Sequence, residues 1–139
     1  MNITPHFSLD EFIVSRHDIN NKPPHTLIAT LLRTAQGMEK VRTILGCPIT
    51  ISSGYRSPEL NSRVGGSANS QHCKGEAVDF VALAFGNSTA ICRAIINSPT
   101  LTFDQLIDEG TWVHISFAQV MRREVLTMRN GKYSKGLTA

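Results

Sequence analysis

The densest group of polar side chains in the sequence lies between Ser70 and Asp79. His72 and Asp79 are seven positions apart, and Gly75 allows a tight bend between them. The alternation of residues 76–81 predicts a strand in which Asp79 lies on the face opposite its apolar neighbours. A carboxylate in an apolar strand is costly to bury unless a cation or a metal ion pairs with it. We therefore expect Asp79 to have a charged partner.

His114 is the natural third member of this group. Residues 112–117 alternate as a strand, with Trp112 and His114 on the face opposite the most apolar side chains. Two imidazoles and one carboxylate with an open fourth position form the ligand set of a catalytic zinc ion. One interpretation of the sequence is therefore a zinc site made by His72, Asp79 and His114. The competing interpretation is that each is an ordinary core or surface side chain.

Other histidines and cysteines offer weaker candidates. Three histidines are interpreted as ordinary side chains: His6, His17 and His25. The cysteines are odd in number and show no CxxC spacing, which favours free thiols over a disulfide framework. We expect Cys47 and Cys92 to be buried. A cysteine hydrolase that uses Cys73 with His114 is a weak alternative, because nothing suggests an electropositive pocket around the thiol.

The first half of the chain predicts helices that frame the site. Ser8 and Glu11 form a capping-box pattern ahead of a short helix. Apolar residues recur at threes and fours over 27–45, which predicts a long amphipathic helix that ends at Gly46. Residues 48–52 alternate as a strand, and an exposed loop follows at 53–56. Ser57 and Pro58 are typical of the start of a brief helix.

The second half predicts a sheet. A helix is expected over 88–97, strands over 103–107 and 112–117, and a C-terminal hairpin within about 120–136 that turns at Asn130-Gly131. Helices come first and antiparallel strands follow, so the fold class is α+β. The 139 residues suffice for a single domain, 1–139.

Composition and charge narrow the function classes. With 41% hydrophobic and 18% charged residues, the chain is neither disordered nor collagen-like. No apolar run is long enough for a membrane span, and residues 1–8 do not read as a signal peptide. We expect cytoplasmic synthesis and a monomer. Residues 118–139 carry a net charge of +4, but aromatic residues do not interleave with the cations, which favours a solvated hairpin over a nucleic-acid surface.

Three motifs together resemble one known family. They are Ser53-Gly54-Tyr55-Arg56-Ser57, the stretch from Ser70-Gln71-His72 to Asp79-Phe80, and Trp112-Val113-His114-Ile115-Ser116. The pattern is similar to the M15 family of zinc D-Ala-D-Ala carboxypeptidases and murein endopeptidases over residues 7–136. It looks most like the short, single-domain branch common in phages. The resemblance implies the fold shared with the Hedgehog signalling domain, a small antiparallel sheet with helices packed on one side.

The same resemblance implies roles for individual residues. Three positions match the family's zinc ligands: His72, Asp79 and His114. Arg56 matches an arginine that holds the substrate and the developing oxyanion, and Ser70 takes the place of a serine that contacts the substrate backbone. Tyr55, in the same expected exposed loop as Arg56, is a further candidate for substrate binding.

The chain departs from the family at one position. Many members carry the catalytic carboxylate three residues before the last histidine ligand, where this chain has Thr111. The nearest acids are Glu109 and Asp108, and Asp104 lies further away. We choose Glu109 as the general base, because a turn at Gly110 can swing it back toward the metal.

The expected function is therefore zinc-dependent hydrolysis of an amide bond in the peptide stem of peptidoglycan. We expect the protein to reach the bacterial cell wall through a lysis protein, as part of a phage particle or after cell breakage. Neither a nucleic acid nor a membrane is expected as a partner. One alternative is a zinc-containing, non-catalytic cell-wall-binding module of the same fold. Another is a non-haem iron oxygenase, which also uses two histidines and a carboxylate but usually with an HxD pair, a spacing that His72 and Asp79 do not match.

Overall fold

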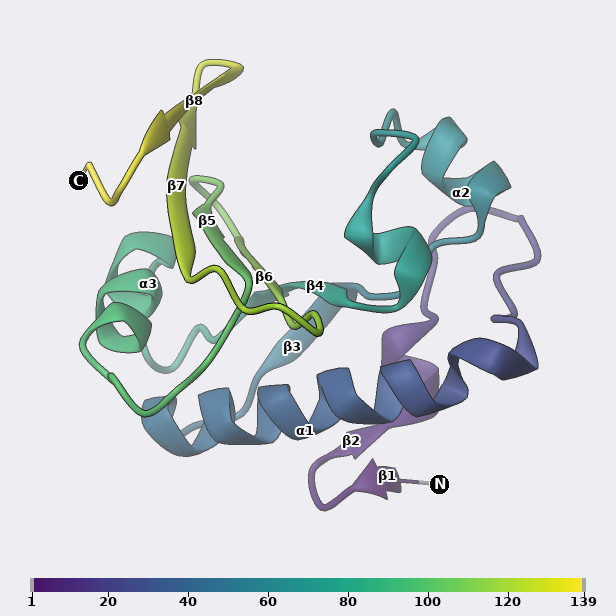
Figure 1. The fold of residues 1–139 in the computed structure, drawn as a ribbon, viewed down its shortest axis with the longest axis horizontal. Coiled ribbons are helices and arrows are strands. Elements are labelled where there is room, and N and C mark those ends of the chain that lie inside the picture. The colour runs from purple at the N-terminus through teal and green to yellow at the C-terminus, as the bar shows by residue number, and fades with distance from the viewer. Residues whose placement is uncertain (1, 139) are drawn as a thin grey trace.

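The computed structural model describes residues 2–138 as eight strands, three α-helices and three 3₁₀ helices (Figure 1). The strands are β1 (Asn2–Thr4), β2 (Phe7–Ser8), β3 (Thr50–Ser53), β4 (Ala77–Val81), β5 (Gln105–Asp108), β6 (Val113–Ser116), β7 (Glu124–Arg129) and β8 (Lys132–Lys135). The α-helices are α1 (Ile28–Leu45), α2 (Pro58–Arg63) and α3 (Ser88–Ile96). The 3₁₀ helices are η1 (Leu9–Phe12), η2 (His25–Leu27) and η3 (Gln71–Lys74).

Six of the strands form one sheet in the order β3-β4-β6-β5-β7-β8, and β1 and β2 form a separate pair. All neighbours in the six-stranded sheet run antiparallel except β5 and β7, which are parallel. The predicted α+β class with a small, mainly antiparallel sheet is confirmed, and the parallel pairing of β5 with β7 is the exception within it. Strand β6 pairs with β4 on one edge and with β5 on the other. Strand β7, which follows β6 in the chain, therefore pairs with the remaining edge of β5.

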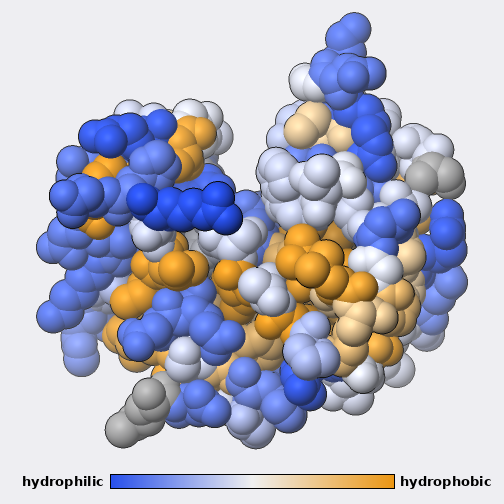
Figure 2. All heavy atoms as spheres, turned by 180° about the vertical axis from the view of Figure 1, so that it is seen from behind, coloured by the Kyte–Doolittle hydropathy of each residue, from blue (hydrophilic) through white to orange (hydrophobic). Residues whose placement is uncertain are grey.

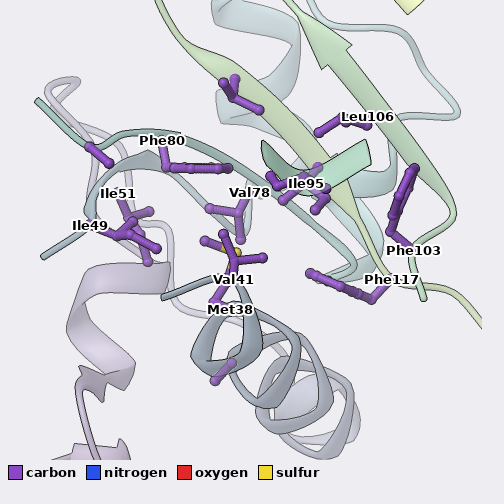
Figure 3. Packing of buried hydrophobic residues seen from close by; sticks show 14 of the residues in the cluster. Met38, Val41, Ile49, Ile51, Val78, Phe80, Ile95, Phe103, Leu106 and Phe117 are labelled. Atoms are coloured by element: carbon purple, nitrogen blue, oxygen red, sulfur yellow. The ribbon is translucent and has the colours of Figure 1, made fainter. Parts of the chain in front are cut away.

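Helices α1 and α3 pack on one face of the sheet (Figure 3). Met38 and Val41 of α1 lie against Val78 and Phe117, and Ile95 of α3 joins the same buried cluster. These side chains are at most 2% exposed. Since side chains alternate along a strand, burying Val78 turns Asp79 toward the opposite face of the sheet. The core thus determines the direction in which the functional residues point.

The local signals in the sequence mark several boundaries as predicted. The Ser8 amide donates to Glu11 Oε2 at 2.7 Å at the start of η1, which ends at Phe12. Gly46 ends α1 with a φ of 66°, a left-handed conformation that suits glycine. Ser57 Oγ accepts a hydrogen bond from the amide of Leu60 at the start of α2. In the turn between β7 and β8, Asn130 and Gly131 both have positive φ, as a type I′ turn requires.

The basic C-terminal segment is attached to the sheet by its arginines. Arg122 Nε lies 2.7 Å from Asp104 Oδ1, and Arg129 Nη2 lies 3.0 Å from Asp108 Oδ2. Arg123 stacks over the ring of Phe103, with 5.0 Å between the guanidinium carbon and the ring centroid. Much of the positive charge of this segment therefore holds the hairpin in place.

The cysteines and the helices of residues 2–138 bear on two further predictions, free buried thiols and the absence of a membrane span. All three cysteines are free, as expected. Cys92 is buried but Cys47 is half-buried, so its predicted burial is wrong. It lies just beyond the end of α1, where only one side is covered by the core cluster. Within residues 2–138, no helix has both the length and the hydropathy that crossing a bilayer requires.

Candidate metal centre and active site

Three side chains converge at the middle of the sheet, on the face turned away from α1 and α3. Asp79 of β4 lies directly opposite His114 of β6 in the antiparallel register, and His72 reaches them from η3. His114 Nδ1 is 3.0 Å and His72 Nε2 is 3.3 Å from Asp79 Oδ1. One potential ligand atom from each of the three lies within 4.8 Å of the others. The structure therefore brings together the three residues predicted from the sequence as zinc ligands.

The orientation of His72 indicates that a cation belongs between these groups. Its Nδ1 lies 2.7 Å from the carbonyl oxygen of Gly54, and a carbonyl can only accept, so Nδ1 carries the proton. In the neutral ring, Nε2 then presents a lone pair to the carboxylate of Asp79. Two acceptors that face each other need a proton or a metal ion between them. An imidazole whose far nitrogen donates to a backbone carbonyl is the usual arrangement of a zinc-binding histidine.

The loop from Gly54 to Arg56 holds η3 in place. The Arg56 amide donates to the carbonyl of His72 at 3.1 Å, so the two segments exchange hydrogen bonds in both directions. Gly54 is needed at this point, because a Cβ there would lie 2.5 Å from the carbonyl oxygen of Phe12. Gly75 has a φ of 73° where η3 ends, and it turns the chain from His72 into β4 as the sequence suggested.

The carboxylate of Asp79 is kept ionised by its neighbours. Burial by itself raises its pKa, but when the neighbouring imidazoles carry protons toward the carboxylate, their hydrogen bonds and charges outweigh burial and lower the pKa below its ordinary value. Arg56 Nη2 also lies 3.3 Å from the second carboxylate oxygen, Oδ2. A permanently ionised carboxylate with one oxygen toward the histidines suits a metal ligand.

Arg56 contacts the candidate centre through Asp79. Its Nε donates to Ser53 Oγ at 3.1 Å and its Nη1 to Asn61 Oδ1 at 3.3 Å. The supporting roles of Ser53 and Asn61 could not be deduced from the sequence, although both lie in or next to the recognised motifs. A Cβ at Gly66 would clash with Asn61 Oδ1, so a larger residue there would force the Asn61 side chain to shift away from Arg56. The guanidinium is thus fixed from three directions, and the arginine also lines the cleft over the centre.

Glu109 and Asp108 are neighbours in sequence but point to opposite faces of the sheet. Glu109 is half-buried and lines the same cleft as His72, Asp79 and His114. Burial raises the pKa of Glu109; among the nearby charges, His114 lowers it whereas Asp79 raises it. Glu109 has no ion-pair or hydrogen-bond partner for its carboxylate among residues 2–138. It is the acid that is free to exchange protons in this cleft.

Asp108 lies on the helix side of the sheet and is engaged there. It is 0% exposed and accepts hydrogen bonds from Ser88 Oγ and Thr89 Oγ1, each at 2.6 Å, and from Arg129 Nη2 at 3.0 Å. Burial opposes ionisation, but these bonds outweigh it and lower the pKa of Asp108 to about 2. Such a carboxylate is a weak base that cannot reach the cleft.

Neither Asp104 nor position 111, where many family members carry the catalytic carboxylate, provides a general base. Asp104 is bound by Arg122, which is the main reason why its pKa falls to about 2, and by Gln71. Thr111 lies outside the cleft and lines a hollow on the side of α3 instead. The geometry therefore singles out Glu109 among the acids near β5.

The cleft has a volume of about 630 Å³ and a mostly polar lining. It appears in Figure 2 as an indentation at the upper edge, between the side that carries α2 and the projecting β7–β8 hairpin. Ser70 lines it, although its Oγ also accepts a hydrogen bond from the amide of His72 at 3.2 Å. Trp112 and Tyr133 add exposed aromatic rings to its walls.

Tyr55 lies elsewhere. The loop at 53–56 was expected to be exposed, but Tyr55 is only 3% exposed and belongs to the hydrophobic core cluster. Its amide donates to the carbonyl of Phe12, which draws the residue inward against the N-terminal segment. The exposure expected of Tyr55 is therefore wrong, and its place among the substrate-binding residues loses its basis. Only Arg56 of this adjacent pair faces the cleft.

Cys73 is poorly placed to be the nucleophile of a cysteine hydrolase, because it does not line the cleft that holds His114. The thiol is half-buried, and burial raises its pKa despite the opposing effect of the Arg56 charge. A thiol with a raised pKa carries little thiolate at neutral pH.

Comparison with known proteins agrees with this arrangement. The family model described as Peptidase M15 matches residues 5–116, a range that includes His72, Asp79, Glu109 and His114. A zinc D-Ala-D-Ala carboxypeptidase of Streptomyces albus G is 42% identical over 55 residues. This match covers 39% of the chain and 22% of that protein's length. The segment from 117 onward, with the β7–β8 hairpin, lies outside the family match.

Proposed function

The chain belongs to the peptidase M15 family, and from this premise we propose that it is a zinc-dependent peptidase acting on the peptide stem of bacterial peptidoglycan. The reaction is hydrolysis of an amide bond, as a D-Ala-D-Ala carboxypeptidase or as an endopeptidase. The observation that carries the proposal is the convergence of two histidines and a carboxylate in one cleft with a free, half-buried glutamate. The partial match to a zinc D-Ala-D-Ala carboxypeptidase supports the choice of metal and substrate.

The residues that would hold zinc are His72, Asp79 and His114. When bound, zinc supplies Lewis acidity, which polarises a carbonyl and lowers the pKa of a water molecule. The protein's own contribution is to fix the ligands before the ion arrives. The Gly54 carbonyl selects the tautomer of His72, and Arg56 holds the outer oxygen of Asp79.

Glu109 is the proposed general base. It takes a proton from the attacking water and returns it to the amine nitrogen as the carbon–nitrogen bond breaks. Burial raises its pKa, which makes it a stronger base than an exposed carboxylate. The lack of a competing partner leaves the carboxylate available for both proton transfers.

Arg56 and Ser70 are the proposed substrate contacts. The Arg56 guanidinium faces the cleft and is fixed by Ser53, Asn61 and Asp79, so the N–H groups that these contacts leave over are positioned to donate to a peptide carboxylate or a developing oxyanion. Ser70 lines the same wall at the start of η3. Its hydroxyl can donate to a substrate carbonyl while it accepts from the His72 amide.

The test is to measure zinc content and to digest purified peptidoglycan, with mass spectrometry of the released fragments to identify the bond that is cut. His72→Ala should lose zinc and activity, whereas His25→Ala, at an exposed histidine that does not line the cleft, should keep both. Wild-type protein that binds neither zinc nor another transition metal would refute the metal centre. Zinc-dependent binding to peptidoglycan without fragment release would establish a binding module instead of an enzyme.

A further inference from the structure

The cleft over the candidate centre continues into a second hollow. This hollow has a volume of about 420 Å³ and extends toward Thr30 at the beginning of α1. Three residues line both spaces: Gln71, Lys74 and Arg122. The cleft and this hollow therefore adjoin at Gln71, Lys74 and Arg122, and together they form a groove that extends from Glu109, after the end of β5, to Asp104, before its beginning.

The length of the groove matches a short peptide. A strand rises about 3.3 Å per residue, so Asp104 and Glu109, five positions apart, lie about 16 Å from each other. An extended peptide of about four or five residues covers this distance. A bound peptide with its scissile amide near Glu109 would thus reach η3 with residues a few positions away.

Most charges along the groove are already neutralised within the protein. The ion pairs are Arg56 with Asp79, Arg122 with Asp104, and Arg33 with Glu76. Two side chains differ. Glu109 and Lys74 have no ion-pair partner among residues 2–138. Among these described residues, the groove thus presents a free acid, Glu109, at one end and a free cation, Lys74, where the cleft joins the second hollow.

We infer that Lys74 forms a subsite for a carboxylate of the substrate peptide, a few residues from the amide that is cleaved. This inference rests on the proposed function and narrows its substrate to an acidic peptide. An ammonium group that lacks an ionic partner in the free protein attracts a carboxylate without first breaking an internal pair. Arg122 is less suited to this role, because Asp104 accepts hydrogen bonds from its Nε and Nη2.

The experiment combines a change in the protein with a matching change in the substrate. The probes are a stem peptide with all carboxylates free and a panel in which each carboxylate is singly converted to an amide. The variants are Lys74→Gln, Lys74→Glu and, as a matched control, Lys132→Gln on the exposed strand β8. The readouts are kcat and KM at low and high salt, and Kd by calorimetry.

For the wild-type protein, converting one particular carboxylate of the peptide to an amide should raise KM about fivefold. This factor corresponds to the upper end of the free energies measured for solvent-exposed ion pairs. Lys74→Gln should raise KM by the same factor for the peptide with all carboxylates free. For the peptide that carries that one amide, Lys74→Gln should cause no additional rise in KM. Lys74→Glu should lose more, and 0.5 M salt should reduce all these differences. Lys132→Gln should match the wild type.

Two results would overturn the subsite: equal effects of Lys74→Gln on every peptide, or no effect on any. The calorimetric comparison separates this failure from failure of the proposed function. Carboxylate-dependent binding through Lys74 without hydrolysis would refute the peptidase and keep the subsite. Hydrolysis with the same kinetics in wild type and Lys74 variants would support the peptidase and refute the subsite. Absence of Lys74-dependent binding would also refute the subsite.

Discussion

Neutralising two adjacent acids should produce opposite defects. Asp108→Asn and Glu109→Gln each replace a carboxylate by an amide of nearly the same shape, one residue apart. Asp108 is sealed on the helix side of the sheet, whereas Glu109 lines the cleft. The first change should therefore reduce stability and leave the chemical step nearly intact. The second should do the reverse.

The cost of Asp108→Asn follows from the linkage between ionisation and folding. The pKa of Asp108 is about 2 in the folded protein, compared with an ordinary value of 3.8. At about 1.4 kcal/mol per pKa unit, the difference corresponds to about 2 kcal/mol of stability at neutral pH. Because the folded pKa is the lower one, this contribution is complete above about pH 4 and is lost as the pH falls toward 2.

Glu109→Gln should have the opposite sign for stability. Burial raises the pKa of Glu109, so above its ordinary value of 4.5 the ionised carboxylate is disfavoured in the fold. Removing the charge should leave the melting temperature unchanged or slightly higher. The loss of the base should reduce the rate by about 10²- to 10⁴-fold with zinc retained.

Both variants can be measured with two assays. Urea unfolding at pH 7 and pH 3, in parallel with the wild type, gives the difference in stability and its pH dependence. Single-turnover hydrolysis gives the rate of the chemical step. If Asp108→Asn proves as stable as the wild type but slow, and Glu109→Gln proves fast, the assignment of faces and the choice of base are both refuted.

Further expectations concern the metal, the arginine, the pH profile and the loop. A chelator should lower the melting temperature of wild-type protein by several degrees, and Asp79→Ala should abolish that difference. Arg56→Lys should reduce kcat/KM about tenfold with zinc retained, because one ammonium cannot replace the planar fork that the cleft holds; wild-type kinetics would exclude a role in substrate binding. The acid limb of kcat/KM should have an apparent pKa above 4.5, since burial raises that of Glu109, with zinc occupancy checked at each pH. Gly54→Ala should cost about 2 kcal/mol in urea unfolding, because its Cβ would lie 2.5 Å from the Phe12 carbonyl; unchanged stability would show that the loop can relax.

Several features of the fold and the site could be predicted from short-range signals in the sequence. The apolar period over 27–45 and Gly46 predicted α1 and its end, and Asn130-Gly131 predicted the turn of the hairpin. These signals act within a few residues, so they need no information from the rest of the fold. The costly carboxylate of Asp79 in an apolar strand pointed to a charged partner in the same way.

The choice between neighbouring acids required the tertiary structure. The predicted strand over 103–107 ends before Asp108 and Glu109, so only the packing of α3 against β5 shows that Asp108 lies on the core side. The same holds for the cations. The sequence shows a basic C-terminal segment, whereas the fold pairs Arg122 with Asp104 and, within residues 2–138, leaves Lys74 in the groove without an ion-pair partner.

The orientation of the candidate ligands was likewise decided by contacts between distant segments. The register that sets Asp79 opposite His114 joins positions 35 residues apart, and the Gly54 carbonyl that selects the tautomer of His72 comes from 18 residues away. The inward turn of Tyr55 and the parallel pairing of β5 with β7 also arise in this way. Residue type and local spacing determine which side chains can perform the chemistry, but long-range pairing has no local signal, so only the folded chain determines where their atoms meet.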